Sequence, residues 1–296
     1  MFIRTHHLLN YNKLISLLAI SFVTQILYLT LPDMLLFLKT MGLALTNIVQ
    51  AGNATDSLPL KYDVYKTSRP IQIDGKMEKA WKKAAWTSYF QDIEGSKKPV
   101  PRLKTRAKML WDENYLYVLA ELEEPHLWAT LTKRDAIIFN DHDFEVFLDP
   151  NNDQEQYFEY EINALGTIMD LFMTRPYKKG GPMVMGWNSD GLISAVELNG
   201  TLNDNRDIDK GWMVEMAIPY KDLERPGRIS NPIPGATWRI NFSRVQWTMD
   251  MDGQSYKRRI GANGKQLPED NWVWSPQGLI DMHVPQYWGY ITFKDK

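Results

Sequence analysis

Apolar and polar side chains alternate in many short stretches from about residue 57 onward, and this alternation constrains the fold more than any other feature of the sequence. Successive side chains of a β-strand point to opposite faces of a sheet, so a period of two indicates strands with one face on a core. Two such stretches separated by turn residues predict a hairpin. One hairpin is expected from residues 103–111 and 115–123, and a second from residues 143–149 and 156–164.

Five further stretches alternate in the same way, and helical patterns are slight. The additional predicted strands cover residues 167–174, 192–200, 211–219, 237–247 and 287–293. Helical signal is found at residues 77–84, with a turn or two at 220–223. Many short strands with turns between them are typical of an all-β protein. We therefore predict an antiparallel β-sandwich, jelly-roll-like, that forms one domain over residues 57–296.

The chain has no cysteine and a net charge of −2 at pH 7. The lack of cysteine excludes disulfides, thiolate nucleophiles and cysteine zinc sites, so stability must come from packing. The nearly balanced charge gives no reason to expect nucleic acid or an acidic membrane surface as a partner. The 11 tryptophans and 14 tyrosines are typical both of aromatic-lined cores and of sugar-binding surfaces.

The first 54 residues differ from the rest of the chain. A basic start is followed by an uncharged apolar run from Leu14 to Leu31 and, after Pro32, by a second apolar stretch. This order predicts a signal peptide or an uncleaved membrane anchor over residues 1–54. A buried helical hairpin and a start codon assigned too far upstream are the alternatives. The remainder is therefore expected outside the cytoplasm, secreted, periplasmic or anchored, with membrane contact only through this segment.

Carboxylates are concentrated on the second predicted hairpin. Asp143 and Glu145 alternate with apolar residues on its first strand, and Glu161 and Asn163 do so on its second. In a simple antiparallel hairpin, Glu145 lies opposite Glu161 and Asp143 lies opposite Asn163. Like charges directly opposite each other destabilise an exposed pair by some tenths to about 1 kcal/mol. A compensating group is therefore expected.

Several groups could compensate this charge. The strand over residues 103–111 carries Lys104, Arg106 and Lys108 at alternate positions, which could lie on the same sheet face. A bound cation or the hydroxyls of a ligand would serve equally well. The simplest alternative is a solvated acidic face balanced by this basic strand. An acidic pair about 5–5.5 Å apart is also the geometry of a retaining glycosidase.

The loop that closes this hairpin is rich in oxygen atoms that could bind a metal. Asp149, Asn151, Asp153 and Glu155 stand at alternate positions. Calcium favours such carboxylate and amide oxygens. The loop lacks the glycine and the distal glutamate of an EF-hand. Asp149, Asn151 and Asp153 are therefore candidate calcium ligands, and a plain surface loop is the alternative.

Six segments carry a family resemblance. They are IDGKMEKAWKKA at 73–84, the stretch at 105–135, DFEVFLDPNND at 143–153, EINALGT at 161–167, GWMVEMAIP at 211–219 and WSPQGLIDMHVPQYWG at 274–289. Taken in order, they resemble the carbohydrate-binding module family 9-like domain across nearly all of residues 60–294. The resemblance implies an antiparallel β-sandwich that binds sugars without catalysis, with bound calcium in some members.

The resemblance also implies roles for individual residues. The family's glutamate that contacts sugar, in the strand D-x-E-V-F-x-D, corresponds to Glu145. The polar position on the next strand corresponds to Glu161, with Asn163 two residues further on. Sugar-binding members also have an aromatic clamp of two tryptophans, one six residues before that glutamate and one shortly before the final P-x-x-x-G. Those two places hold Phe139 and Met282 in this chain.

The sequence therefore favours non-catalytic carbohydrate binding in extracytoplasmic polysaccharide recognition or catabolism, with a mono- or oligosaccharide as the partner. The alternative is a glycoside hydrolase that uses Glu145 and Glu161 as its acidic pair. Calcium is the one cofactor considered, and neither haem nor a nucleotide is expected. The candidate ligand-binding residues are Glu145, Glu161, Asn163, Arg106, Phe139, Met282 and, as a substitute aromatic platform, Trp274.

Overall fold

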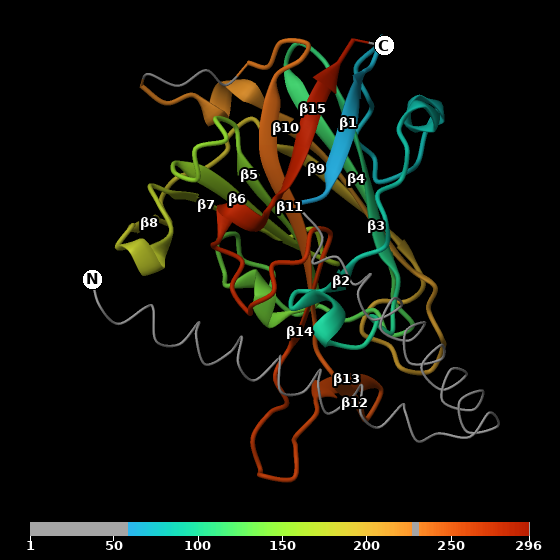
Figure 1. Cartoon of the computed structure of the whole chain (residues 1–296). Coiled ribbons are helices and arrows are strands. Elements are labelled where there is room, and N and C mark those ends of the chain that lie inside the picture. The colour runs from blue at the N-terminus through green and yellow to red at the C-terminus, as the bar shows by residue number, and fades with distance from the viewer. Residues whose placement is uncertain (1–58, 227–230, 296) are drawn as a thin grey trace, which may run out of the picture. The chain divides into compact units, whose positions relative to one another are not determined.

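A computed structural model of the chain describes residues 59–226 and 231–295, which are coloured in Figure 1. The predicted export or anchor segment, residues 1–54, lies outside these described residues. In the two described ranges, no helix is long and apolar enough to cross a membrane.

The described chain is mostly β. Its strands are β1 (Lys61–Lys66), β2 (Gln91–Asp92), β3 (Thr105–Trp111), β4 (Tyr115–Glu123), β5 (Asp143–Asp149), β6 (Tyr157–Asn163), β7 (Ile168–Met173), β8 (Met183–Val184), β9 (Ile193–Asn199), β10 (Gly211–Pro219), β11 (Thr237–Gln246), β12 (Met249–Asp252), β13 (Ser255–Arg258), β14 (Asp270–Val273) and β15 (Gly289–Lys294). Its helices are short 3-10 turns at Lys79–Lys83, Gly95–Lys97, Ile138–Asn140, Tyr177–Lys179, Tyr220–Leu223 and Pro285–Tyr287. The all-β prediction and the two predicted helical turns are confirmed.

One large sheet contains most of the strands, in the order β8-β7-β6-β5-β11-β15-β1-β3-β4-β10-β9. Strand β14 pairs with both β11 and the short β2, and β12 and β13 form a separate hairpin. Both predicted hairpins are present, because β3 pairs with β4 and β5 pairs with β6, each antiparallel. The sheet curls so that its two halves face each other, as a β-sandwich requires (Figure 1).

Strand β1 corrects the prediction that every strand pair is antiparallel. It lies between β15 and β3 and runs parallel to both of them. Parallel neighbours need long crossover connections, and the segment between β1 and β3 is long enough to provide one. The alternation in KYDVYK was not among the predicted strands, although Tyr62 and Val64 are buried as a strand's inner face requires. Through β1, strands from the two ends of the domain join the two halves of the sheet.

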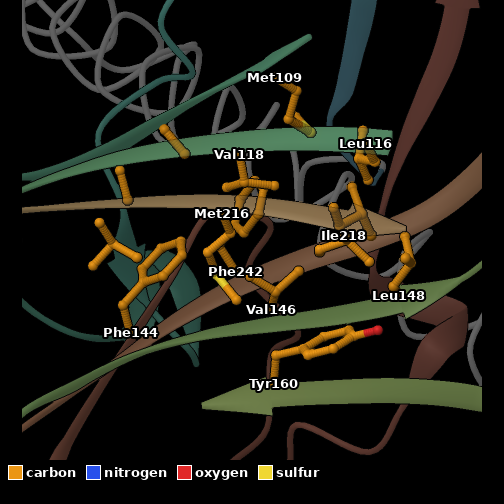
Figure 2. Close-up of a cluster of buried hydrophobic side chains, with 14 of the residues drawn as sticks. Met109, Leu116, Val118, Phe144, Val146, Leu148, Tyr160, Met216, Ile218 and Phe242 are labelled. Atoms are coloured by element: carbon orange, nitrogen blue, oxygen red, sulfur yellow. The ribbon is translucent and has the colours of Figure 1, made fainter. Parts of the chain in front are cut away.

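The main core fills the space between the two halves. Figure 2 shows side chains from β5, β6 and β11 pointing toward side chains from β3, β4 and β10. Phe144, Val146 and Leu148 on β5 are completely buried there, as are Leu116 and Val118 on β4. Full burial of one such side chain contributes roughly 1.5–3 kcal/mol. The inward-facing apolar positions of β4 and β5 therefore serve this core.

The opposite face of β5 and β6 is buried as well. Every residue of both strands is buried. Phe147 of β5 and Tyr157 of β6 form a second cluster there with Ile138 and Trp288, which come from the segments that cover this face. The expectation of a solvated acidic face is therefore wrong, because chain segments distant in sequence pack over the carboxylates. This covering layer is what creates a site.

Gly289 at the start of β15 is predicted to be intolerant of a side chain. A Cβ atom there would lie 2.5 Å from Cζ3 of Trp274 and 3.0 Å from the carbonyl oxygen of Leu60. We expect Gly289→Ala to lower the free energy of unfolding by about 1–3 kcal/mol, because a packed core resists overfilling. Urea denaturation would measure this loss. Gly186→Ala is the control, since its Cβ would meet no atom within 4 Å; equal stability of the two variants would contradict the prediction.

Candidate functional site

Four carboxylates lie together on the covered face of β5 and β6. The register places Glu145 opposite Glu161, Asp143 opposite Asn163 and Glu159 opposite Phe147. The two facing pairs predicted from the sequence are therefore confirmed. The group Asp143, Glu145, Glu159 and Glu161 is called the acidic cluster below. All four residues are buried.

A pocket of about 380 Å³ opens over the acidic cluster. Glu145, Glu159 and Glu161 form part of its lining, and Phe139 and Met282 are also in its wall. Met169 of the next strand, β7, also lines the pocket, and further lining residues come from segments beyond β7, among them Tyr177, Met183, Met185 and His283. The structure thus brings together four of the seven predicted ligand-binding residues: Glu145, Glu161, Phe139 and Met282.

Phe139 and Met282 occupy the two places that the family resemblance assigns to an aromatic clamp, and each is held through its backbone. The indole N–H of Trp247 donates to the carbonyl oxygen of Phe139 at 2.9 Å. The indole N–H of Trp288 donates to the carbonyl oxygen of Met282, also at 2.9 Å. Buried tryptophans usually find a partner for this N–H. Here the partners are backbone carbonyl oxygens of two pocket-lining residues. Trp247 and Trp288 therefore fix the backbone on both sides of the pocket.

Glu161 connects the acidic cluster to the pocket wall. Its Oε2 atom accepts a hydrogen bond from the backbone N–H of Phe139 at 2.9 Å. Phe139 lies in the short helix Ile138–Asn140, and its ring is 40% exposed. A carboxylate that accepts a backbone N–H fixes the position of the loop that donates it. Glu161 therefore positions an exposed aromatic ring at the mouth of the pocket.

Burial and mutual repulsion make these carboxyl groups hard to ionise. Burial raises the pKa of Glu145 well above its ordinary range, and the neighbouring Glu161 raises it further. The pKa values of Asp143 and Glu161 are raised for the same two kinds of reason. Burial, with Glu145 nearby, raises the pKa of Glu159 to about 8. Near neutral pH the cluster must therefore hold protons or face a positive charge.

His283 does not supply that positive charge. Burial lowers its pKa to about 4, so the ring is neutral at pH 7. Its Nδ1 atom lies 2.8 Å from the hydroxyl of Tyr157, and its Nε2 atom lies 3.6 Å from Oε2 of Glu159. The ring of Tyr177 packs edge-on against it, with centroids 5.0 Å apart. His283 is thus a neutral hydrogen-bonding group in the pocket lining.

The basic strand β3 does not compensate the acidic cluster either, which corrects the sequence-based expectation. Strands β11, β15 and β1 separate β3 from β5 in the sheet. Arg106 instead pairs with Glu121 at 2.7 Å and stacks on Trp86. Lys108 donates to the carbonyl oxygens of Trp81 and Ala84. Alternation showed that these cations share a face but could not show how far that face lies from the carboxylates.

Arg239 and Arg244 lie on β11 at positions that alternation places on opposite faces of the strand, and both are engaged elsewhere. Arg244 is buried and pairs with Glu124 at 2.9 Å. Arg239 donates to the carbonyl oxygens of Pro285 and Gln286. Neither guanidinium group belongs to the pocket lining.

Two other predicted ligand-binding residues have structural roles outside the pocket. Trp274 is buried in the main core, where Tyr62 packs edge-on against it at 6.5 Å. Asn163 donates to the carbonyl oxygen of Leu131 and to Asp141, and it accepts N–H groups of the turn that follows it. The number of tryptophans and their positions in the sequence could not show whether Trp274 is a core residue or an aromatic surface for a sugar.

The sequence did not single out Glu159, Tyr177, Met183 or His283 as site residues. Glu159 could have been found, because it shares the alternating face of Glu161. Tyr177, Met183 and His283 come from segments far along the chain, and only tertiary folding brings them to the pocket.

The loop proposed as a calcium site is occupied by turn contacts. Asp149 accepts the backbone N–H groups of Asn151 and Gln154. Asp153 accepts the N–H of Glu155 at 3.0 Å. These contacts account for the shape of the loop without a cation, and calcium binding by Asp149, Asn151 and Asp153 stays a prediction.

A different group has the geometry for a cation. One carboxylate oxygen from each of Asp143, Glu145 and Glu161 lies within 4.8 Å of the others, the one such group of three found among the described residues.

Comparison with known proteins identifies the family. The model of the family described as "Carbohydrate family 9 binding domain-like" matches residues 73–260, which is more than half of the chain. The chain belongs to that family. A crystallised family 9 carbohydrate-binding module from Caldicellulosiruptor kristjanssonii, in complex with cellotriose, is similar in fold with a TM-score of 0.50. It is 17% identical, and the alignment covers 80% of this chain and 94% of that module.

Curated relatives of this family 9 domain are parts of larger enzymes. Endo-1,4-beta-xylanase C of Paenibacillus barcinonensis is 38% identical over 96 residues, 31% of this chain and 8% of the enzyme. Exoglucanase XynX of Acetivibrio thermocellus is 29% identical over 178 residues, 60% of this chain and 14% of the enzyme. The chain therefore spans only a small part of the curated relatives it matches.

The pKa of His283 gives a test of the packing in this family 9 domain. Because the pKa lies below its unfolded value of about 6.5, the folded state binds fewer protons, and stability is lost as pH falls from about 6.5 to 4. We expect the free-energy difference between wild type and His283→Gln to shrink by about 3 kcal/mol over that range. Urea denaturation of both proteins at each pH gives this difference.

The buried carboxylates have raised pKa values, so their contribution to stability changes with pH in the opposite direction. Because wild type and His283→Gln share these carboxylates, this contribution cancels in the difference between the two proteins. NMR titration of the histidine signals provides the direct control. A signal of His283 that titrates near pH 6.5 would contradict the buried, neutral ring.

Proposed function

We propose that this domain binds a carbohydrate, without catalysis, in the pocket over the acidic cluster. The observation that carries the proposal is the convergence of Glu145, Glu161, Phe139 and Met282 on one cavity. These are the positions at which the family resemblance expects sugar contacts. They come from separate segments of the chain, and the fold brings them together.

The chemistry of the pocket suits a saccharide. Sugars present hydroxyl groups around a ring whose faces are largely C–H, so they are bound by charged or amide oxygens together with aromatic faces. Phe139 and Tyr177 line the pocket and are 40% and 43% exposed, so we propose them as the aromatic contacts for a sugar. Glu145 and Glu159 each keep one carboxylate oxygen that accepts no hydrogen bond within the protein. Both residues belong to the pocket lining, so we propose their carboxyl groups as polar contacts for sugar hydroxyls.

The size of the pocket favours a short saccharide or a chain end. Its volume of about 380 Å³ lies at the lower end of the usual range for ligand pockets. The related module from Caldicellulosiruptor kristjanssonii has been crystallised with cellotriose and with glucose. Glucose and short gluco- or xylo-oligosaccharides are therefore the first ligands to test.

The electrostatics support binding over glycoside hydrolysis. A glycosidase needs one carboxyl group that stays ionised and one that stays protonated, so their pKa values must be pushed apart. Burial raises the pKa values of both Glu145 and Glu161. No feature of the pair assigns one carboxyl as nucleophile and the other as acid.

We also propose that the domain acts outside the cytoplasm, in polysaccharide recognition. Two features support this location: the apolar segments within residues 1–54, typical of a signal peptide or anchor, and relatives named as a xylanase and an exoglucanase. Under this proposal the membrane is contacted only through the N-terminal segment. Calcium is proposed as a cofactor, and neither haem nor a nucleotide is.

Phe139→Ala tests the pocket. We expect the Kd for the best ligand among glucose, cello- and xylo-oligosaccharides to rise about tenfold or more, because loss of an aromatic stacking face costs on the order of 1.4 kcal/mol. Titration calorimetry on the full chain measures the affinity. Tyr89→Ala is the matched control, since Tyr89 is 47% exposed but lies in a separate groove beside Lys104 and Arg106.

Three results would count against the proposal. Weaker binding in Tyr89→Ala with unchanged binding in Phe139→Ala would move the site to the other groove. Absence of heat for every sugar would remove the carbohydrate function. Release of reducing ends that Glu145→Gln abolishes would establish hydrolysis in place of simple binding.

A further inference from the structure

We infer that Asp143, Glu145 and Glu161 form a binding site for a hard divalent cation next to the pocket, whose lining includes the two glutamates. The inference goes beyond sugar binding, because the cation would bind whether or not a saccharide is present. It also differs from the loop of Asp149, Asn151 and Asp153 that the sequence suggested for calcium.

The spacing of the three carboxylates fits one cation. Calcium binds oxygen at about 2.3–2.6 Å, so two ligand atoms on opposite sides of the ion are about 5 Å apart. One oxygen from each of the three carboxylates lies within 4.8 Å of the other two. Asp143 and Glu145 come from β5, and Glu161 comes from β6. The ligands are thus held by paired strands, which fix them more firmly than a loop would.

Unused hydrogen-bonding capacity points to a ligand at this place. Oδ2 of Asp143 and Oε2 of Glu145 are buried and have no hydrogen-bond partner. A third strand reaches the same place: Oγ of Ser243 on β11 is buried, lies opposite Glu145 in the register and has no partner other than that carboxylate. Buried polar atoms in native proteins nearly always have partners. A cation bound by the carboxylates would use these oxygens.

Among the described residues, no lysine or arginine side chain is placed against the three carboxylates. The described residues that line the pocket include no lysine or arginine. The ion pairs of Arg106 and Arg244 are made with Glu121 and Glu124, away from the pocket. Three ionised carboxylates cannot stay buried so close together without compensation. Glu161 shares a side-chain hydrogen bond with Glu159, whereas Asp143 and Glu145 each keep a buried oxygen without a partner, which a bound cation would engage.

The ligand atoms select the class of cation. All of them are oxygens, and neither cysteine nor methionine sulfur belongs to the group. Carboxylate and hydroxyl oxygens suit calcium, magnesium or manganese, whereas zinc and copper favour nitrogen and sulfur. Three carboxylates leave coordination positions open on a calcium ion, which takes 6–8 oxygens. Since Glu145 and Glu161 also line the pocket, hydroxyl groups of a bound saccharide could fill some of them; this consequence rests on the proposed function.

Calcium titration of the chelator-treated full chain, in the absence of sugar, tests the site. We expect saturable binding to the wild type and Kd values about tenfold or more weaker for Glu145→Gln and for Glu161→Gln, because calcium affinity depends on the number of charged ligands. Asp153→Asn distinguishes the two candidate calcium sites: it removes one charge from the loop of Asp149, Asn151 and Asp153, and its affinity should be unchanged if the measured calcium ion is bound by Asp143, Glu145 and Glu161. Magnesium and manganese titrations then define the preferred ion.

Thermal unfolding distinguishes loss of the site from loss of the fold. Glutamine keeps the shape of glutamate and removes a buried charge, so the metal-free Gln variants should be at least as stable as the metal-free wild type. Calcium should raise the Tm of the wild type and of Asp153→Asn but not that of the Gln variants. Lack of binding to the wild type would overturn the inference, and so would binding lost in Asp153→Asn but kept in both Gln variants. Sugar titrations with and without calcium are a separate readout, so failure of the proposed function leaves the calcium result intact.

Discussion

The register between β5 and β6 is the constraint on which both the core and the pocket depend. Because side chains alternate, the register that places Phe144, Val146 and Leu148 on the main core also places Asp143 and Glu145 on the other face, with Glu145 opposite Glu161. A shift of one residue would move every apolar side chain out of the core and every carboxylate into it. Burial of the six core-facing side chains of β5 and β6 thus holds the carboxylates in close proximity despite their repulsion; these are Phe144, Val146, Leu148, Phe158, Tyr160 and Ile162. The fold supplies the energy that keeps an electrostatically unfavourable site assembled.

The segments that cover the outer face of β5 and β6 turn that face into a pocket. Hydrogen bonds to their backbone hold these segments in place. Trp247, Trp288 and Glu161 each make one hydrogen bond to the backbone of a pocket wall, at Phe139 or Met282. These bonds do not depend on which side chain stands at position 139 or 282. The backbone path of the clamp can therefore be kept while the side chains of its walls change, as Phe139 and Met282 illustrate in a family whose sugar-binding members use tryptophan there.

Much of the fold could be predicted from the sequence because alternation is a local property. Both hairpins, the facing pair Glu145 and Glu161 and the inner faces of the strands follow from it. The parallel placement of β1 could not be predicted, since no local pattern records which distant strand it joins. The same limit explains two wrong expectations. Arg106 is positively charged but lies on β3, which three strands separate from β5. Trp274 is buried in the core because of how the sheet curls, which its local sequence does not record. His283 and Tyr177 reach the pocket only through tertiary contacts.

The position of β1 has a consequence for how the domain forms. Its partners include β15, the last strand of the chain, so that Lys61 lies beside Tyr290. The two halves of the sheet cannot be joined through this pairing until nearly the whole domain has been synthesised. Contacts between such distant residues carry a large loop-closure entropy and slow folding. We therefore expect the local hairpins to form early and the pairing of β1 with β15 and β3 to form last. Until then, the unpaired edges of β15 and β3 could pair with strands of other chains.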